Sequence, residues 1–364
     1  MQEPRSLSDR LHLDLPLVFG LVVLCVIGLL VLYSASGENL QVVLKQSMRM
    51  LFAFMIMFLI AQVKPSHLFY WTPWLYTICV VLLLAVLLYG EVAQGAQRWL
   101  RIGPVNLQPS ELAKLTIPLM VGYYLAERSL PPRLLRVAMA GVLVLLPTLL
   151  IAKQPDLGTA ILIASSGLIA LFLAGLSWRL IVVLGVMGAA ALPALWFVMH
   201  DYQRRRVLMF IDPEQDPLGA GYHIIQSKIA IGSGGLYGKG WLNGTQSQLE
   251  FLPERSTDFI FSVFSEEFGL LGVTSLLAIY LFVVLRGLYI AANAQDAFGR
   301  IVAGSLVLTF FVYVFVNAGM VSGLLPVVGV PLPLISYGGS SIVTLMAAFG
   351  LIMAIHTHRR LLSD

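Results

Sequence analysis

Charge is scarce in this sequence. Only 12% of its residues are charged and 58% are hydrophobic, whereas soluble globular proteins carry about 25% charged residues. This composition excludes an ordinary soluble domain, because a soluble core could not hide so much apolar surface. The net charge of +4 does not indicate nucleic-acid binding, since Lys and Arg lie mostly between long apolar runs. Both cysteines, Cys25 and Cys79, lie inside such runs, so neither a disulfide nor a metal site is expected.

Common catalytic signatures are also missing. The sequence has no nucleophile–base constellation, no zinc-ligand spacing and no dinucleotide fingerprint. Its glycine-rich stretch 232–240 is not a phosphate-binding P-loop, because Ser233 replaces the first glycine and Gly240 replaces the Ser or Thr after Lys239. We expect this stretch to be a flexible loop whose backbone approaches a ligand or partner closely.

Long hydrophobic runs dominate what is present. A transmembrane helix needs about twenty apolar residues. Candidate spans are 15–35, 47–63, 71–89, 109–127, 134–152, 157–175, 179–199, 258–285, 300–322 and 341–357. We therefore predict an all-α membrane protein with about ten transmembrane helices, forming a single polytopic domain over 1–364. An even number of spans places both termini on one side of the membrane.

The basic residues predict which side that is. With a cytoplasmic N-terminus, eleven Lys and Arg face inward and five lie on the short outward loops. The positive-inside rule favours this orientation, with both termini cytoplasmic. The loop 200–257, between the seventh and eighth spans, then faces outward.

The outward loop is unusually cationic. Its basic residues are Arg204, Arg205, Arg206, Lys228, Lys239 and Arg255. These side chains could contact lipid headgroups at helix ends. Alternatively, they could form a binding surface for an anionic substrate outside the cell membrane, such as a lipid-linked phosphate.

Ionisable residues also occur inside the predicted spans, where each costs roughly 2.5–3.5 kcal/mol on insertion scales. Glu111 and Lys114 lie at spacing i,i+3 in the fourth span and can pair on one helix face. They form either a structural ion pair or part of an outward-open cavity. Glu266 and Glu267 lie in the eighth span, where protonation or pairing with Lys114 is the structural alternative to a cavity role.

Two aspartates precede helix starts on the outward side. Asp258 opens the eighth span, and Asp156 precedes the sixth. Each is expected to cap its helix. Asp258 also ends the cationic loop, so its carboxylate could accept a proton from a substrate hydroxyl. The stretch 324–341, with three prolines and the pair Gly338-Gly339, is expected to be buried in protein or to line a cavity.

Several motifs together resemble the SEDS family of bacterial cell-wall polymerases. They occur in family order along nearly the whole chain, at Arg98-Trp99, 108–114, 154–159, 252–269 and 333–341. The stretches 221–240 and 244–248 are more similar to the elongation type than to the division type. Ser256 stands where the family often has His, so nothing catalytic is assigned to that position.

The resemblance implies a peptidoglycan glycosyltransferase that polymerises lipid II at the outer face of the bacterial cytoplasmic (inner) membrane during elongation. Asp258 matches the family's essential aspartate. Glu111 and Lys114 match its intramembrane pair near the central cavity. Further predicted substrate-binding or cavity residues are Arg98, Arg101, Asp156, Glu266, Glu267 and Ser336. The implied partners are a class B penicillin-binding protein and the other proteins of the elongation complex.

No cofactor is required by the sequence and no metal ligands are assigned, although a divalent cation (Mg or Mn) could assist a pyrophosphate leaving group. Two other functions fit the same residues. Broken helices and buried charges also suit a transporter that flips lipid II, although a transporter would place its key carboxylate at the midplane. The loop could instead serve as a scaffold that recruits the transpeptidase.

Overall fold

The structure consists mainly of long helices. This computed structural model describes residues 11–93, 96–102, 105–126, 132–198, 204, 208, 220–248 and 254–358. The helices that overlap the predicted spans are α2 (Leu15–Ala35), α3 (Leu40–Ala61), α4 (Pro65–Tyr89), α5 (Pro109–Ala126), α6 (Leu134–Lys153), α7 (Leu157–Leu173), α8 (Trp178–Val198), α12 (Ile260–Ala292), α13 (Ala297–Val321) and α14 (Ser340–Thr357). Seven helices in the described part are long and apolar enough to cross a membrane. The chain is thus a helical, multi-pass membrane protein, and the count of ten and the side of the termini stay predictions.

Aspartates define where several of these helices begin. Asp14, Asp156 and Asp296 are the N-caps of α2, α7 and α13. Each carboxylate accepts a hydrogen bond from the backbone N–H three residues further on, at 3.0, 3.2 and 2.6 Å respectively. These bonds satisfy donors that the first helical turn leaves unpaired. The capping role predicted for Asp156 is confirmed. The same role predicted for Asp258 is wrong, because the N-cap of α12 is Phe259, without a side-chain hydrogen bond.

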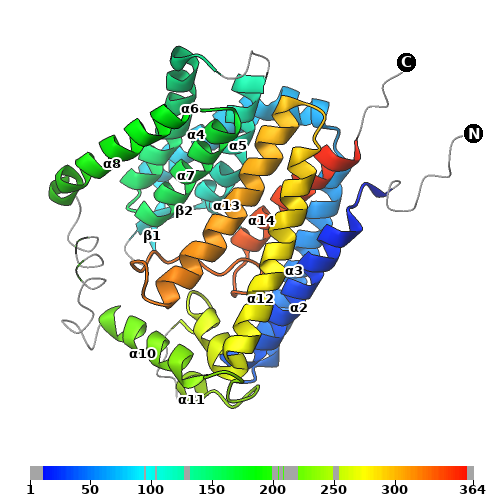
Figure 1. Ribbon diagram of the computed structural model, residues 1–364, viewed down its shortest axis with the longest axis vertical. Coiled ribbons are helices and arrows are strands. Elements are labelled where there is room, and N and C mark those ends of the chain that lie inside the picture. Colours follow the sequence, from blue (N-terminus) through cyan, green and yellow to red (C-terminus); the bar gives the residue numbers. More distant parts are fainter. Residues whose placement is uncertain are drawn as a thin grey trace, which may run out of the picture.

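Two large apolar cores hold the bundle together. One joins α2, α12, α13 and α14 with part of the non-helical segment 322–339, and the other joins α4, α5, α6 and α7. Figure 1 shows α12 and α13 running side by side through the bundle. Many apolar side chains on the outer faces are exposed, as expected for helices that contact lipid.

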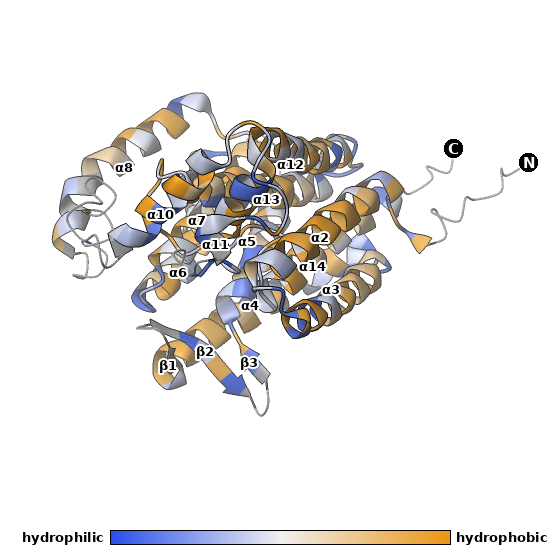
Figure 2. Ribbon diagram, turned by 90° about the horizontal axis from the view of Figure 1, so that it is seen from below, coloured by the Kyte–Doolittle hydropathy of each residue, from blue (hydrophilic) through white to orange (hydrophobic). Residues whose placement is uncertain are grey.

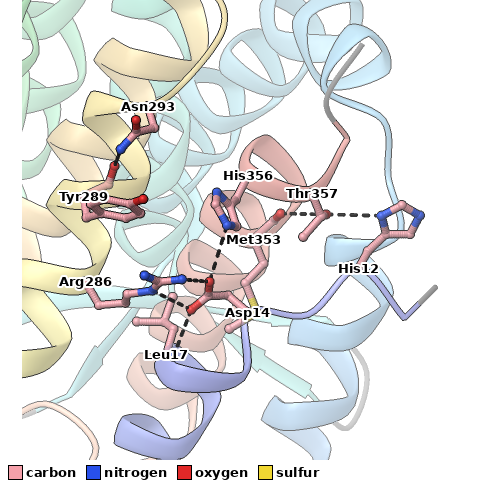
Figure 3. Close-up of polar contacts among 9 residues, drawn as sticks. All are labelled: His12, Asp14, Leu17, Arg286, Tyr289, Asn293, Met353, His356 and Thr357. Atoms are coloured by element: carbon pink, nitrogen blue, oxygen red, sulfur yellow. Dashed lines mark hydrogen bonds and ion pairs between the residues drawn. The ribbon is translucent and has the colours of Figure 1, made fainter. Parts of the chain in front are cut away.

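The ends of α2, α12 and α14 meet in a polar cluster around Asp14 (Figure 3). Arg286 of α12 donates two hydrogen bonds to the Asp14 carboxylate, at 3.0 and 2.6 Å. His356 Nε2 of α14 lies 3.5 Å from the same carboxylate. Burial alone would raise the pKa of Asp14, but hydrogen bonds from Arg286 and from the Leu17 N–H, together with nearby positive charge, hold it below its usual value.

Elements that the sequence did not predict lie between the spans. A three-stranded antiparallel sheet follows α4, with β1 (Glu91–Ala93), β2 (Ala96–Ile102) and β3 (Val105–Leu107) in that order. Hydrophilic colour on β2 contrasts with the hydrophobic helices in Figure 2. The predicted loop 200–257 contains α10 (Ala220–Ser233) and the short α11 (Thr245–Gln248). Figure 1 places both at the end of the bundle opposite the start of α2. Arg205 and Arg206, expected in the cationic loop, lie outside the described residues.

The helix α12 changes direction at Gly269, which has φ 62° and ψ −164°. The glycine-rich loop docks into this break through backbone hydrogen bonds, from Lys239 N to Glu266 O (3.0 Å) and from Leu270 N to Gly235 O (2.9 Å). A Cβ on Gly238, whose φ is 79°, would lie only 2.1 Å from Glu267 O. Glycine is therefore required at 238 by both backbone conformation and close approach. The loop is packed against α12, which explains its glycine content.

Candidate active site at the rim of the bundle

Asp258 lies in a turn that leads into α12. The Thr257 N–H donates to Glu254 O (3.0 Å) within this turn. The next two residues, Phe259 and Ile260, are buried, whereas Asp258 is partly exposed. The backbone is thus anchored by its apolar neighbours while the carboxylate stays accessible.

Asn317 of α13 fixes the backbone of Asp258. Its Nδ2 donates to Asp258 O at 3.0 Å and to Val330 O at 2.7 Å. Asn317 is fully buried, so these bonds form in a medium where an unpaired amide is costly. The Asp258 carboxylate also borders Gly329, where a Cβ would lie 3.5 Å from Oδ2. Three chain segments therefore meet at this aspartate.

Ser336 connects the segment 322–339 to the turn before α12. Its hydroxyl donates to Thr257 O (2.6 Å) and accepts from Leu332 N (2.7 Å). The neighbouring Tyr337 N–H donates to Ser256 O at 2.8 Å. Leu332, Leu334 and Ile335 are also buried, so the prediction that this segment is buried in protein holds for its middle part, whereas Leu324 at its start is exposed. The Ser336 hydroxyl thus donates one hydrogen bond and accepts another, both with the backbone. This is a positioning role, and its predicted place in a substrate cavity stays a prediction.

Glu111 and Lys114 form the predicted pair on α5. Lys114 Nζ lies 2.6 Å from Glu111 Oε1, and both side chains are about nine-tenths buried. The ammonium also lies 4.8 Å from the centre of the Tyr313 ring on α13. Tyr313 precedes Asn317 by four residues, so the two share a helix face. One face of α13 therefore contacts Lys114 through Tyr313 and the backbone of Asp258 through Asn317.

Arg98 of β2 and Asp156 at the start of α7 form a second ion pair. The distance from Arg98 Nε to Asp156 Oδ2 is 3.3 Å, with the Arg98 side chain one-third exposed. A Cβ on Gly158 would collide with Val328, so the start of α7 packs directly against the segment that carries Gly329. Arg101, on the same strand, is exposed. Since Arg98 and Arg101 are three residues apart on one strand, they point to opposite faces of the sheet, and only Arg98 is paired with Asp156.

Glu266 anchors the glycine-rich loop and α11, and Glu267 contacts α2. Glu266 is fully buried and accepts from Lys239 Nζ (2.6 Å), Thr245 Oγ1 (3.0 Å) and Gln246 N (3.1 Å). Glu267 accepts from the Ser34 hydroxyl of α2. Glu266 therefore pairs with Lys239, whereas the pairing partner considered from the sequence, Lys114, pairs with Glu111. These contacts tie α10 and α11 to the helix that follows Asp258.

Sequence reasoning missed Asn317, Tyr313 and Gly329. Asn317 could have been identified from the sequence, because a single amide in the apolar run 300–322 requires buried hydrogen-bond partners. Gly329 and Tyr313 left none, since their importance depends on segments far apart in the chain. In the described part of the chain, no three His, Cys, Asp or Glu side chains gather as metal ligands, and a divalent cation stays a prediction.

Comparison with known proteins identifies the family. Residues 11–361 match the family described as "Cell cycle protein", which comprises FtsW, RodA and SpoVE. The peptidoglycan glycosyltransferase MrdB of Escherichia coli (strain K12) is 58% identical over 360 residues, which cover 99% of this chain and 97% of MrdB.

Two solved structures agree. One, from work on "Structural coordination of polymerization and crosslinking by a peptidoglycan synthase complex", superposes with a TM-score of 0.82 at 34% identity, covering 95% of this chain and 99% of that chain. The other, the Rod shape determining protein RodA of Thermus thermophilus, gives a TM-score of 0.73 at 28% identity, covering 95% and 98%. The chain belongs to the FtsW, RodA and SpoVE family, the SEDS family that its motifs resemble.

Proposed function

We propose that this chain is a peptidoglycan glycosyltransferase of the elongation type, which polymerises lipid II at the outer face of the bacterial inner membrane. Its 58% identity to MrdB over almost the whole of both chains supports the activity. The main structural support for the mechanism is the partly exposed Asp258. Asn317 donates a hydrogen bond to its carbonyl oxygen, and Ser336 donates to the preceding Thr257 carbonyl. A class B penicillin-binding protein is the proposed partner, as the relative solved within a peptidoglycan synthase complex suggests. The other elongation-complex proteins are proposed on the same family grounds.

Asp258 acts as the general base in this proposal. Its carboxylate takes the proton from the 4-hydroxyl of the acceptor sugar of an incoming lipid II. The oxygen attacks the anomeric carbon of the growing chain's terminal sugar and inverts it from α to β. The bond to the pyrophosphate breaks, and undecaprenyl pyrophosphate leaves with the electron pair. Rigid support of Asp258 favours this reaction because proximity and orientation contribute much of the rate.

The cationic groups have a separate role. Negative charge develops on the departing pyrophosphate, and Arg98, Arg101 and Lys114 provide positive charge on the elements around the rim. The carboxylates of Asp156 and Glu111 neutralise two of these cations at rest. We propose that Glu111 and Asp156 hold their partners in place for the substrate phosphates and thereby keep the free site from carrying uncompensated buried charge.

The test uses purified protein, lipid II and the partner transpeptidase, with glycan length on gels as the readout. Asp258→Asn should lower the polymerisation rate about 10²–10⁴-fold, the usual contribution of general base catalysis. Wild-type polymer lengths from Asp258→Asn would exclude the general-base role. In liposomes, movement of labelled lipid II without polymerisation would favour a transporter, and recruitment of the transpeptidase without either activity would favour a scaffold.

A further inference from the structure

The segment between α13 and α14 adopts a backbone conformation that needs support from its neighbours. Residues 333–338 are not helical, and Leu334 has a φ of 64°, in a region that residues other than glycine rarely occupy. Such a conformation persists only where the surrounding structure fixes it. Tyr280 of α12 fixes the start of this segment, because its hydroxyl donates to Pro333 O at 2.6 Å. The end of the segment is held from α3.

Gln46 of α3 contacts the end of this segment with both polar atoms of its side-chain amide. Its Nε2 donates to Ser336 O at 3.2 Å, and its Oε1 accepts from Gly338 N at 3.5 Å. A primary amide suits this position because it is a donor and an acceptor at once. Gln46 is fully buried, so the loss of either partner would leave a polar atom unpaired away from water.

Arg49 contacts the residue between these two bonds. It lies three residues after Gln46, on the same face of α3. Its guanidinium carbon lies 4.8 Å from the centre of the Tyr337 ring, a distance typical of cation–π contacts. A Cβ on Gly339 would lie 3.6 Å from Arg49 Nε. Since α3 packs along α14 (Figure 2), both side chains reach residues 336–339 from the same helix.

The same segment supports the turn that carries Asp258. The Ser336 hydroxyl donates to Thr257 O at 2.6 Å. The Tyr337 N–H donates to Ser256 O at 2.8 Å. The backbone of residues 336–338 therefore lies between α3 on one side and this turn on the other. A shift of the segment at α3 would move the turn and, with it, the carboxylate that takes the proton.

We propose that Gln46, with Arg49 beside it, is a positioning residue for glycosyl transfer, which fixes the place of Asp258 through residues 336–338. This inference rests on the proposed function, because it concerns the general base of that reaction. A misplaced base lowers the rate of the chemical step and leaves the binding of lipid II unchanged. Gln46 thus acts at a distance, from a helix that the sequence does not connect with the catalytic turn.

Steady-state polymerisation kinetics with Gln46→Met test this role. Methionine is also long and unbranched and suits an apolar helix, but it makes neither hydrogen bond. We expect kcat to fall about tenfold, with KM for lipid II within about twofold. The matched control is Gln62→Met at the other end of α3, which removes a 2.7 Å bond from Gln62 Nε2 to Leu11 O. This control should keep the wild-type kcat.

Combination with Ser336→Ala tests whether Gln46 acts through the segment. Both substitutions weaken the same support of Asp258, so their effects on kcat should not multiply, and the double variant should lose little more than the worse single variant. Ser336→Ala combined with Gln62→Met should show only the effect of Ser336→Ala. Arg49→Met should also lower kcat and should show the same non-additivity with Ser336→Ala.

Hydrogen exchange gives a readout that does not depend on activity. Because the Gly338 N–H bonds to Gln46, a peptide that covers residues 336–339 should exchange faster in Gln46→Met than in wild type. The turn 254–258 should also exchange faster. Gln62→Met should match wild type in both peptides. If Gln46→Met yields no folded protein, Arg49→Met provides the same kinetic and exchange tests.

Three results would overturn the proposal. A raised KM with unchanged kcat would assign Gln46 to substrate binding. Multiplying effects of Gln46→Met and Ser336→Ala on kcat would show that the two residues act independently. Wild-type kcat per folded molecule together with wild-type exchange would show that the amide supports nothing near Asp258. Failure of the proposed function differs from all three, because wild-type protein would then make no polymer.

Discussion

At the scale of single residues, buried polar groups support the candidate site, since Asn317 holds the backbone of Asp258 and Lys114 pairs with Glu111. Asp258, Glu111, Lys114 and Asp156 are visible in the sequence because charge beside or inside an apolar run is costly. The Glu111–Lys114 pair follows from helical spacing alone. The partner of Arg98 could not be predicted, since it depends on a sheet whose short strands carry a weak signal. Asn317 illustrates the limit best: its amide is conspicuous, but its two carbonyl partners are 59 and 13 residues away.

Substitution of Asn317 tests whether it positions Asp258. Asn317→Leu removes both hydrogen bonds and frees the turn before α12, and a displacement of about 1 Å near a reacting group can cost 10²-fold in rate. We expect kcat to fall by about 10–100-fold with KM for lipid II within about twofold. Steady-state polymerisation kinetics measure this split. A loss of folded protein with normal kcat per folded molecule would instead assign Asn317 a purely structural role.

At the scale of elements, the break in α12 and the glycine-rich loop form one unit. Gly238→Ala should prevent the loop from docking, because the new Cβ would lie 2.1 Å from Glu267 O and φ is 79°. Gly235→Ala is the matched control, since its φ of 56° carries the same backbone strain of about 1–2 kcal/mol but its Cβ meets nothing within 4 Å. We expect Gly238→Ala to lower the unfolding temperature in detergent clearly more than Gly235→Ala. Equal decreases in unfolding temperature for the two variants would show that the close contact of Gly238 with α12 does not contribute to stability.

The cluster around Asp14 predicts a pH dependence. A depressed pKa in the folded state means that the Asp14 carboxylate contributes stability above its unfolded pKa of 3.8 and loses it as pH falls through the lower folded value. Asp14→Asn should therefore cost about 1–3 kcal/mol at neutral pH, the range for charged hydrogen bonds.

The difference between wild type and Asp14→Asn should persist down to about pH 4 and disappear below it. Thermal unfolding of both proteins across this range, followed by tryptophan fluorescence, provides the measurement. A difference that closed already at pH 6 would show that the Asp14 carboxylate is not the group whose titration controls this stability.

At the scale of the whole molecule, the orientation in the membrane is the main open prediction, and the protein suits thiol labelling. The native Cys25 and Cys79 are 4% and 1% exposed, so they should give little background. A membrane-impermeant maleimide added to intact spheroplasts should label Tyr237→Cys, in the loop predicted to face outward, but not Asn293→Cys between α12 and α13. Permeabilised cells provide the control in which both react. The reverse pattern would place the glycine-rich loop and Asp258 in the cytoplasm and end the proposal of polymerisation outside.

The clamp between Ser336 and Thr257 has a consequence for biosynthesis. The turn that carries Asp258 emerges from the ribosome 79 residues before the serine that secures it. Until the segment 322–339 has been made and α14 has entered the membrane, the aspartate has no support from that side. We therefore expect Asp258 to reach its supported position only after the segment 322–339 and α14 have been inserted.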